Sequence, residues 1–113
     1  MIGMDDRNNV AAMRLTPKIA EQRIRKLAAI SDNVIWSTHA REQMLKREIF
    51  DVDGFRILRE GYVDEQPQKT DREGEWKCKI TLKLRGSRTA GVVVIILQNA
   101  KLFVKTVEWE DQL

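Results

Sequence analysis

The chain has 113 residues, of which 42% are hydrophobic and 33% charged, a balance typical of one folded domain and not of a disordered chain. Its longest apolar run, from Val92 to Leu97, is far shorter than the roughly 20 residues that cross a bilayer. One Cys excludes an internal disulfide, and one His with one Cys cannot build a structural zinc site. The acidic first residues do not resemble a signal peptide. We therefore expect a cytoplasmic protein with no metal, no cofactor and no membrane contact.

The N-terminal part of the chain predicts an arm followed by a helix. Residues 1–15 show no sustained periodicity and are expected to form a flexible arm, so that residues 16–113 make a single domain. Thr16 followed by Pro17 is typical of a helix start, because Pro fits the first helical position without losing a hydrogen bond. This helix is expected to end near Ile30.

Two further helices are expected, over about 39–48 and from 51 to 61, after a short extended piece at 34–36. Ser37 or Thr38 would cap the first of these helices, and Asp51 would cap the second. The positions expected to face inward are Ala40, Met44, Leu45, Val52, Phe55 and Leu58.

After these helices the apolar residues recur at every second position, which is the period of a strand. A strand is expected over 62–66, followed by a polar loop over 68–74. The clearest pattern runs from 76 to 84, where apolar residues alternate with cationic ones and predict a strand with one core face and one charged face. Two more strands are expected over 92–97 and 101–109. The predicted fold class is α+β: about three helices, then a four-stranded antiparallel sheet covered by helices on one face.

The net charge of +3 is too small to indicate nucleic-acid binding by itself, but the charges are unevenly distributed. Seven basic residues and no acidic residue lie between positions 77 and 105, and acidic segments flank them. The basic residues are Lys77, Lys79, Lys83, Arg85, Arg88, Lys101 and Lys105. Two interpretations are open: a nucleic-acid contact surface, or a solvated face whose lysines protect an edge strand from aggregation.

Three other residues have side chains that occur in catalytic or binding sites. His39 near a helix start could act as a neutral general base, although a lone His is more often a structural residue with satisfied hydrogen bonds. Trp109 at the end of the last predicted strand could stack on a base, or could instead close the end of the core. Cys78 lies on the core face of its predicted strand and is expected to have no role.

The run WSTHAREQMLKREI (residues 36–49), followed by DVDGFRILREGYVDEQP, resembles an uncharacterised bacterial domain family. That family has the pattern S-x-H-A-x-x-R-M-x-x-R-x-I, and Gln43 stands where it usually has Arg. The family is similar to a branch of the RelE, BrnT and MqsR toxin superfamily. The segment GEWKCKITLKL also resembles the corresponding MqsR strand, with Lys77 where MqsR has Tyr.

This resemblance implies a RelE-like fold whose open sheet face binds RNA and cuts it without a metal ion. Together with the residue chemistry above, it gives the candidate catalytic residues Lys77, Lys79 and His39. The candidate RNA-binding residues are Lys83, Arg85, Arg88, Lys105 and Trp109. A lysine can act as a base only if neighbouring cations and desolvation lower its pKa, and the row of lysines is one way to achieve that.

The expected function is therefore that of a toxin in a toxin–antitoxin pair, an endoribonuclease that cuts mRNA by attack of a ribose 2′-hydroxyl on the adjacent phosphate. Its expected partners are RNA, including ribosome-bound mRNA, and an antitoxin protein. The alternative is a non-catalytic module of the same fold that binds RNA or a protein through the same face.

Overall fold

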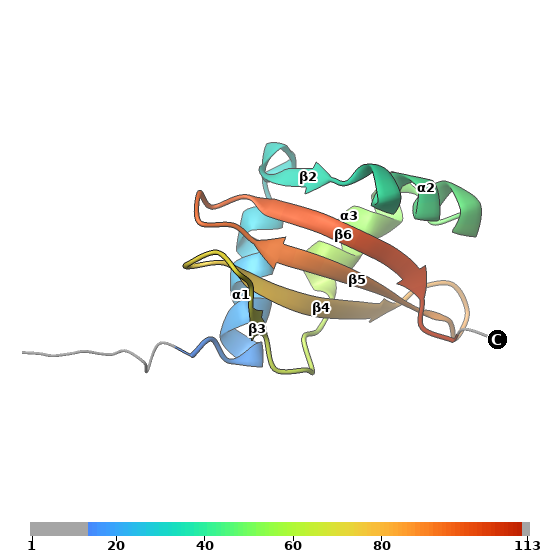
Figure 1. The fold of residues 1–113 in the computed structure, drawn as a ribbon. Coiled ribbons are helices and arrows are strands. Elements are labelled where there is room, and N and C mark those ends of the chain that lie inside the picture. The colour runs from blue at the N-terminus through green and yellow to red at the C-terminus, as the bar shows by residue number, and fades with distance from the viewer. Residues whose placement is uncertain (1–13, 112–113) are drawn as a thin grey trace, which may run out of the picture.

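The computed structural model describes residues 14–111 and contains three helices, one short 3₁₀ turn and five strands in this part of the chain (Figure 1). In chain order these are α1 (Pro17–Ala28), the turn Ser31–Asn33, β2 (Val34–Trp36), α2 (Thr38–Arg47), α3 (Asp51–Glu60), β3 (Gln68–Lys69), β4 (Trp76–Lys83), β5 (Thr89–Ile96) and β6 (Leu102–Trp109).

The strands form one sheet in the order β2-β6-β5-β4-β3. The strands β4, β5 and β6 are an antiparallel meander, whereas β2 pairs with β6 in parallel. In Figure 1, α1 and α3 lie behind the sheet and α2 lies beyond its β6 edge. The predicted α+β class is confirmed. The prediction of four strands, all antiparallel, is wrong, because the extended piece at 34–36 joins the sheet as a parallel edge strand.

The expected strand over 62–66 is also wrong. Tyr62 forms only an isolated bridge with Thr81, and the strand β3 lies further on, inside the predicted polar loop. The backbone N–H of Val63 donates instead to the carboxylate of Glu21 in α1, at 2.9 Å. This contact draws the chain toward the helix, so it cannot continue along the edge of β4.

The core lies between the sheet and helices α1 and α3. Its fully buried side chains include Ile24, Ile57 and Leu58 from the helices, with Ile80 and Val92 from the strands. The register predicted for the alternating segment is confirmed for the residues that decide it. Those residues are Cys78 and Ile80, which are buried, and Lys77 and Lys83, which are exposed.

The predicted helix starts are largely confirmed. The side chain of Thr16 accepts the N–H of Ile19 at 3.2 Å, and that of Ser37 accepts the N–H of Ala40 at 2.9 Å. The third helix differs, because its cap is Phe50, whose N–H donates to Oδ2 of Asp53 at 2.9 Å.

Two of the expected inward positions are wrong. Leu45 is 85% exposed and Val52 is 71% exposed. Successive helical residues are about 100° apart. Since Met44 and Ile57 take the core positions on their helices, neighbouring side chains such as that of Leu45 turn toward solvent.

The expected N-terminal arm falls mostly on residues 1–13, which lie outside the described part of the chain. Leu15, which the expected arm included, is buried, and its carbonyl accepts a hydrogen bond from Nε2 of Gln66 at 2.7 Å. Of the helices within residues 14–111, none has the length and apolar character needed to cross a membrane.

Candidate functional site

One face of the sheet carries no helix in the described part of the chain, and we refer to it as the open face (Figure 1). Strand register brings Lys77 of β4 into line with Ile95 and Phe103, and Lys79 into line with Val93. The side chains assigned to this face by the register are Lys77, Lys79, Thr81, Lys83, Val93, Ile95, Phe103, Thr106 and Glu108. The open face therefore combines cations, hydroxyls, apolar side chains and a carboxylate.

The expected surface of unmixed positive charge does not form, because the fold brings acidic residues from elsewhere in the chain to the same cations. Nζ of Lys79 lies 2.6 Å from Oε1 of Glu110. Arg88 makes a paired contact with Asp111, at 2.9 and 3.0 Å. Residues 77–105 contain no acidic residue in the sequence, but in the folded protein some of their cations are paired with carboxylates.

Lys79 and Glu110 meet across the intervening strand. Glu110 follows β6, and its N–H donates to the carbonyl of Thr89 at 2.8 Å, which fixes its backbone beside β5. Its carboxylate lies over Gly91 of β5, where an added Cβ would overlap Oε2. A shallow pocket of about 320 Å³ surrounds the pair, lined by Asp64, Glu65, Lys79, Thr81, Thr89 and Glu110. Despite these acids, no group of possible ligands in residues 14–111 has the arrangement of a metal site.

The surroundings of Lys79 raise its pKa above the ordinary value of a lysine. The hydrogen bond with Glu110 is the main cause, and the negative charges of Glu110, Glu65 and Glu108 act in the same direction, against a smaller lowering by burial. Lys79 is therefore an ammonium at neutral pH. The lowered pKa that a lysine base requires is absent here, which leaves Lys79 suited to donate a proton or to stabilise negative charge.

Three of the candidate cations are exposed and, within residues 14–111, form no ion pair. They are Lys77 and Lys83 of β4 and Lys105 of β6. Lys105 is the extra residue where the pairing of β5 with β6 shifts register, a β-bulge. These three side chains are free to bind an anion.

Arg85 is held away from the open face. Its guanidinium contacts the carboxylate of Asp53 and donates to the carbonyl of Glu48 at 3.2 Å, both of which belong to the helical side of the molecule. It also lies over the rings of Phe50 and Trp109. The RNA contact expected of Arg85 would require it to leave these contacts.

Trp109 is buried, with 7% of its surface exposed, and its Nε1 donates to the carbonyl of Arg47 at 3.0 Å. The guanidinium of Arg88 lies 4.1 Å from its ring centre. Stacking on a base would require Trp109 to leave these contacts, and its burial fits the alternative, that it closes the end of the core. Phe103 is the aromatic residue that the register places on the open face.

His39 is exposed at the second position of α2, and its imidazole forms no hydrogen bond within the described residues. It does not line the pocket around Lys79. His39 therefore lies outside the pocket that contains Lys79, although both are candidate catalytic residues.

The other residues of the S-x-H-A-x-x-R-M pattern attach α2 to the edge of β6 that β2 leaves uncovered. Oγ of Ser37 donates to the carbonyl of Lys105 at 3.0 Å, and Oε1 of the buried Gln43 accepts the N–H of Val107 at 2.8 Å. Ala40 is completely buried. The pattern is therefore mainly architectural, and His39 is its exposed member.

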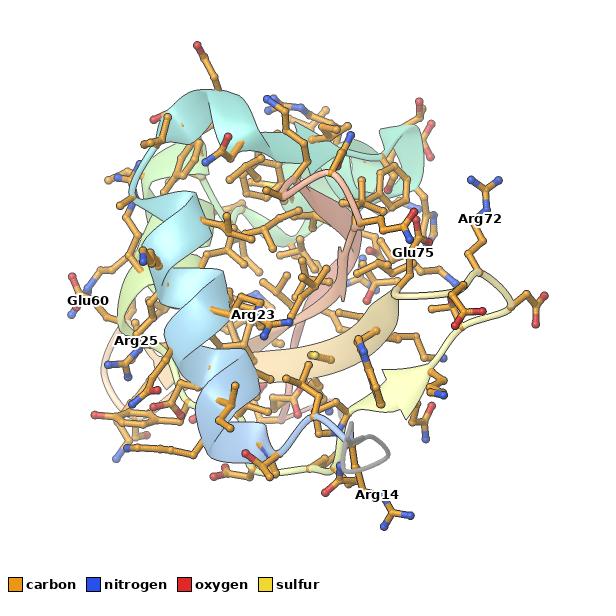
Figure 2. The ribbon with its side chains drawn as sticks, turned by 90° about the vertical axis from the view of Figure 1, so that its left-hand side faces the viewer. Arg14, Arg23, Arg25, Glu60, Arg72 and Glu75 are labelled. Atoms are coloured by element: carbon orange, nitrogen blue, oxygen red, sulfur yellow. The ribbon has the colours of Figure 1, made fainter. Side chains whose placement is uncertain are left out.

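Cys78 is buried in the core, and burial raises the pKa of its thiol to about 12, with a smaller opposing effect of the positive charge of Arg23. Figure 2 shows Arg23 on the side of α1 that faces the sheet. The same view shows Arg72 and Glu75 on the turn between β3 and β4.

We expect Cys78 to resist alkylation by iodoacetamide at pH 9, because the thiolate is the reactive form and the folded protein keeps the thiol protonated. The unfolded chain in urea should be alkylated rapidly at the same pH. Mass spectrometry of timed samples measures both rates. Equal rates with and without urea would contradict the assigned burial.

Sequence reasoning missed Glu110 and Gly91, which shape the pocket. A signal for Gly91 existed, since a glycine beside the apolar run at 92–97 marks a close approach when it lies inside a strand. The strand expected over 92–97 begins one residue too late to include it, whereas β5 begins at Thr89.

Comparison with known families finds that residues 36–109 match DUF4258, described as a domain of unknown function. The match begins with the S-x-H-A pattern and ends with β6. No curated protein and no solved structure matches the chain.

Proposed function

The chain belongs to the DUF4258 family, and from the chemistry of its open face we propose that it is a metal-independent endoribonuclease and the toxin of a toxin–antitoxin pair. The observation that carries the proposal is the ammonium of Lys79 in an open pocket, flanked on its own strand by the exposed Lys77 and Lys83. Residues two apart on a strand lie roughly 7 Å apart on the same face. A strand with this spacing offers several phosphate contacts in a row.

The reaction requires three groups at the scissile phosphate: a base for the 2′-hydroxyl, cations for the charge that grows on the phosphate oxygens, and an acid for the leaving 5′ oxygen. Lys79 supplies a proton donor and a positive charge. Phe103 adds an aromatic ring on the same face, on which a base can stack. The resemblance of the segment around Lys77 to the MqsR strand supports a toxin of this kind.

A second candidate is a non-catalytic module that binds a partner through the same face. The acidic lining of the pocket favours it, because Asp64, Glu65 and Glu110 reduce the attraction of Lys79 for phosphate. The two candidates differ in one result: whether bound RNA is cut.

The deciding experiment incubates the purified protein with end-labelled RNA of mixed sequence in EDTA. We expect cleavage that leaves a 2′,3′-cyclic phosphate and a 5′-hydroxyl, identified by mass spectrometry of the fragments. Binding without cleavage would favour the non-catalytic module, and the absence of both would reject an RNA function for this face.

Lys77→Ala should weaken RNA binding. It should also make the plot of the logarithm of the association constant against the logarithm of the salt concentration less steep, by about 0.7 for the lost phosphate contact. The reason is that each lysine–phosphate contact releases counterions from the RNA. Lys46→Ala is the matched control, since Lys46 is equally exposed but lies on α2. Fluorescence anisotropy at several salt concentrations measures the slope, and equal slopes for the two variants would remove Lys77 from the RNA contact.

A further inference from the structure

We infer that Glu110 and Lys79 form the acid–base pair of this site, with Glu110 as the general base for the ribose 2′-hydroxyl and Lys79 as the general acid for the leaving oxygen. This inference rests on the proposed ribonuclease function and assigns roles to residues within it. Glu110 belongs to none of the candidate residues that the sequence suggested.

The first support is the glycine beneath the pair. Lys79 comes from β4 and Glu110 from the end of β6, so β5 lies between them. They meet only because Gly91 of β5 has no side chain: an added Cβ would overlap Oε2 of Glu110 and lie 3.3 Å from Cε of Lys79. Glycine weakens the interior of a strand, where a β-branched residue fits better. The space that it leaves is filled by the carboxylate.

The second support is accessibility. The side chain of Lys79 is 34% exposed and that of Glu110 is 27% exposed, so both are held in place and remain open to a substrate from the pocket. Thr81 and Thr89 line the same pocket and can donate hydrogen bonds to phosphate oxygens. The hydrogen bond to Glu110 keeps Lys79 protonated, as a general acid must be.

The steps balance without a metal ion or another reactant. The carboxylate of Glu110 takes the proton of the 2′-hydroxyl while the 2′ oxygen forms a bond to phosphorus. The bond from phosphorus to the 5′ oxygen breaks with its electron pair, and the ammonium of Lys79 protonates that oxygen. The products are a 2′,3′-cyclic phosphate and a 5′-hydroxyl. Glu110 is then protonated and Lys79 neutral, and one proton transfer across their 2.6 Å contact restores both.

The direct test is Glu110→Gln, which keeps the shape of the side chain and removes the base. We expect kcat/KM for RNA cleavage to fall at least about 100-fold, while RNA affinity stays equal or rises because a negative charge is lost. Glu42→Gln is the charge control, because it removes the same charge from an exposed position on α2, outside the pocket and the open face.

A second variant separates the pair while keeping both groups. In Gly91→Ala the new Cβ meets the flexible end of Glu110, which can move aside without disturbing the backbone. We expect a folded protein with a loss of kcat similar to that of Glu110→Gln. Gly86→Ala is its control, since Gly86 has open space around it and a positive φ of 59°; that change strains the loop and should leave kcat unaltered.

Lys79→Arg tests the acid. Arginine keeps the positive charge but releases its proton far less readily, so kcat should fall about 100-fold with KM little changed. Cleavage by Glu110→Gln and Gly91→Ala at the wild-type rate would overturn the assignment of Glu110 and leave the ribonuclease proposal standing. Absence of cleavage by the wild-type protein at every pH, with RNA bound, would overturn the ribonuclease proposal and these roles with it.

Discussion

Alanine in place of Gly61 should lower the free energy of unfolding by about 3 kcal/mol, the upper range for overpacking a filled interior. The added Cβ would lie 2.5 Å from the carbonyl oxygen of Ile57 and 2.7 Å from that of Thr81. Both are backbone atoms, held by α3 and β4, so neither can move away cheaply. Gly61 is where the chain leaves α3 and bridges to β4, and the following loop carries Asp64 and Glu65 to the pocket.

Urea unfolding followed by circular dichroism measures this loss. Gly86→Ala is the comparison, because Gly86 has no atom near the added Cβ and only a left-handed backbone to strain, which costs about 1 kcal/mol. A Gly61→Ala protein as stable as Gly86→Ala would show that the junction of α3 with β4 is looser than its distances indicate.

Leucine in place of Gln43 should cost about 2 kcal/mol of stability, the usual penalty for leaving a buried hydrogen-bonding group without a partner. Oε1 of Gln43 accepts the N–H of Val107, and both groups are buried. Leucine fills the space but offers no acceptor. The N–H of Val107 also has no strand beside it, because β2 pairs only with residues 102–104 of β6.

The control for Gln43→Leu is Glu42→Leu, since the exposed Glu42 precedes it on α2. Thermal unfolding should show a clear drop in Tm for the first variant and little change for the second. Gln43→Arg should also destabilise the protein, because arginine has no acceptor atom. Equal stability of wild type and Gln43→Arg would mean that the edge of β6 does not need this acceptor.

The helices were predictable from local chemistry, because Thr16, Pro17 and Ser37 act within one helical turn of themselves. Strand β4 was predictable because its alternation persists over many residues and only one register buries Ile80. The extended conformation at 34–36 was predictable, but its parallel pairing with β6 was not, because it depends on a strand far along the chain. Strand β3 was not predictable, since it has two residues and exists only because β4 lies beside it.

The candidate site was only partly predictable for a related reason. Lys79 belongs to a pattern visible in the sequence, but its partner Glu110 reaches it across a third strand, over Gly91. Counting charges along the sequence cannot reveal that Glu110 lies beside Lys79 in the folded protein. The cations between 77 and 105 are free of acids only in the linear order of residues, and the raised pKa of Lys79 follows from the order of strands in the sheet.

The parallel pairing of β2 with β6 has a consequence for biogenesis. Val34 pairs with Leu102, and Ser37 bonds to the carbonyl of Lys105, so α2 acquires its anchor from a strand that is synthesised well after it. Contacts between such distant segments form slowly, because a long loop must close first. We therefore expect α2 to remain unprotected against hydrogen exchange on a nascent chain until β6 has left the ribosome, which makes its uncovered apolar side a target for chaperones during translation.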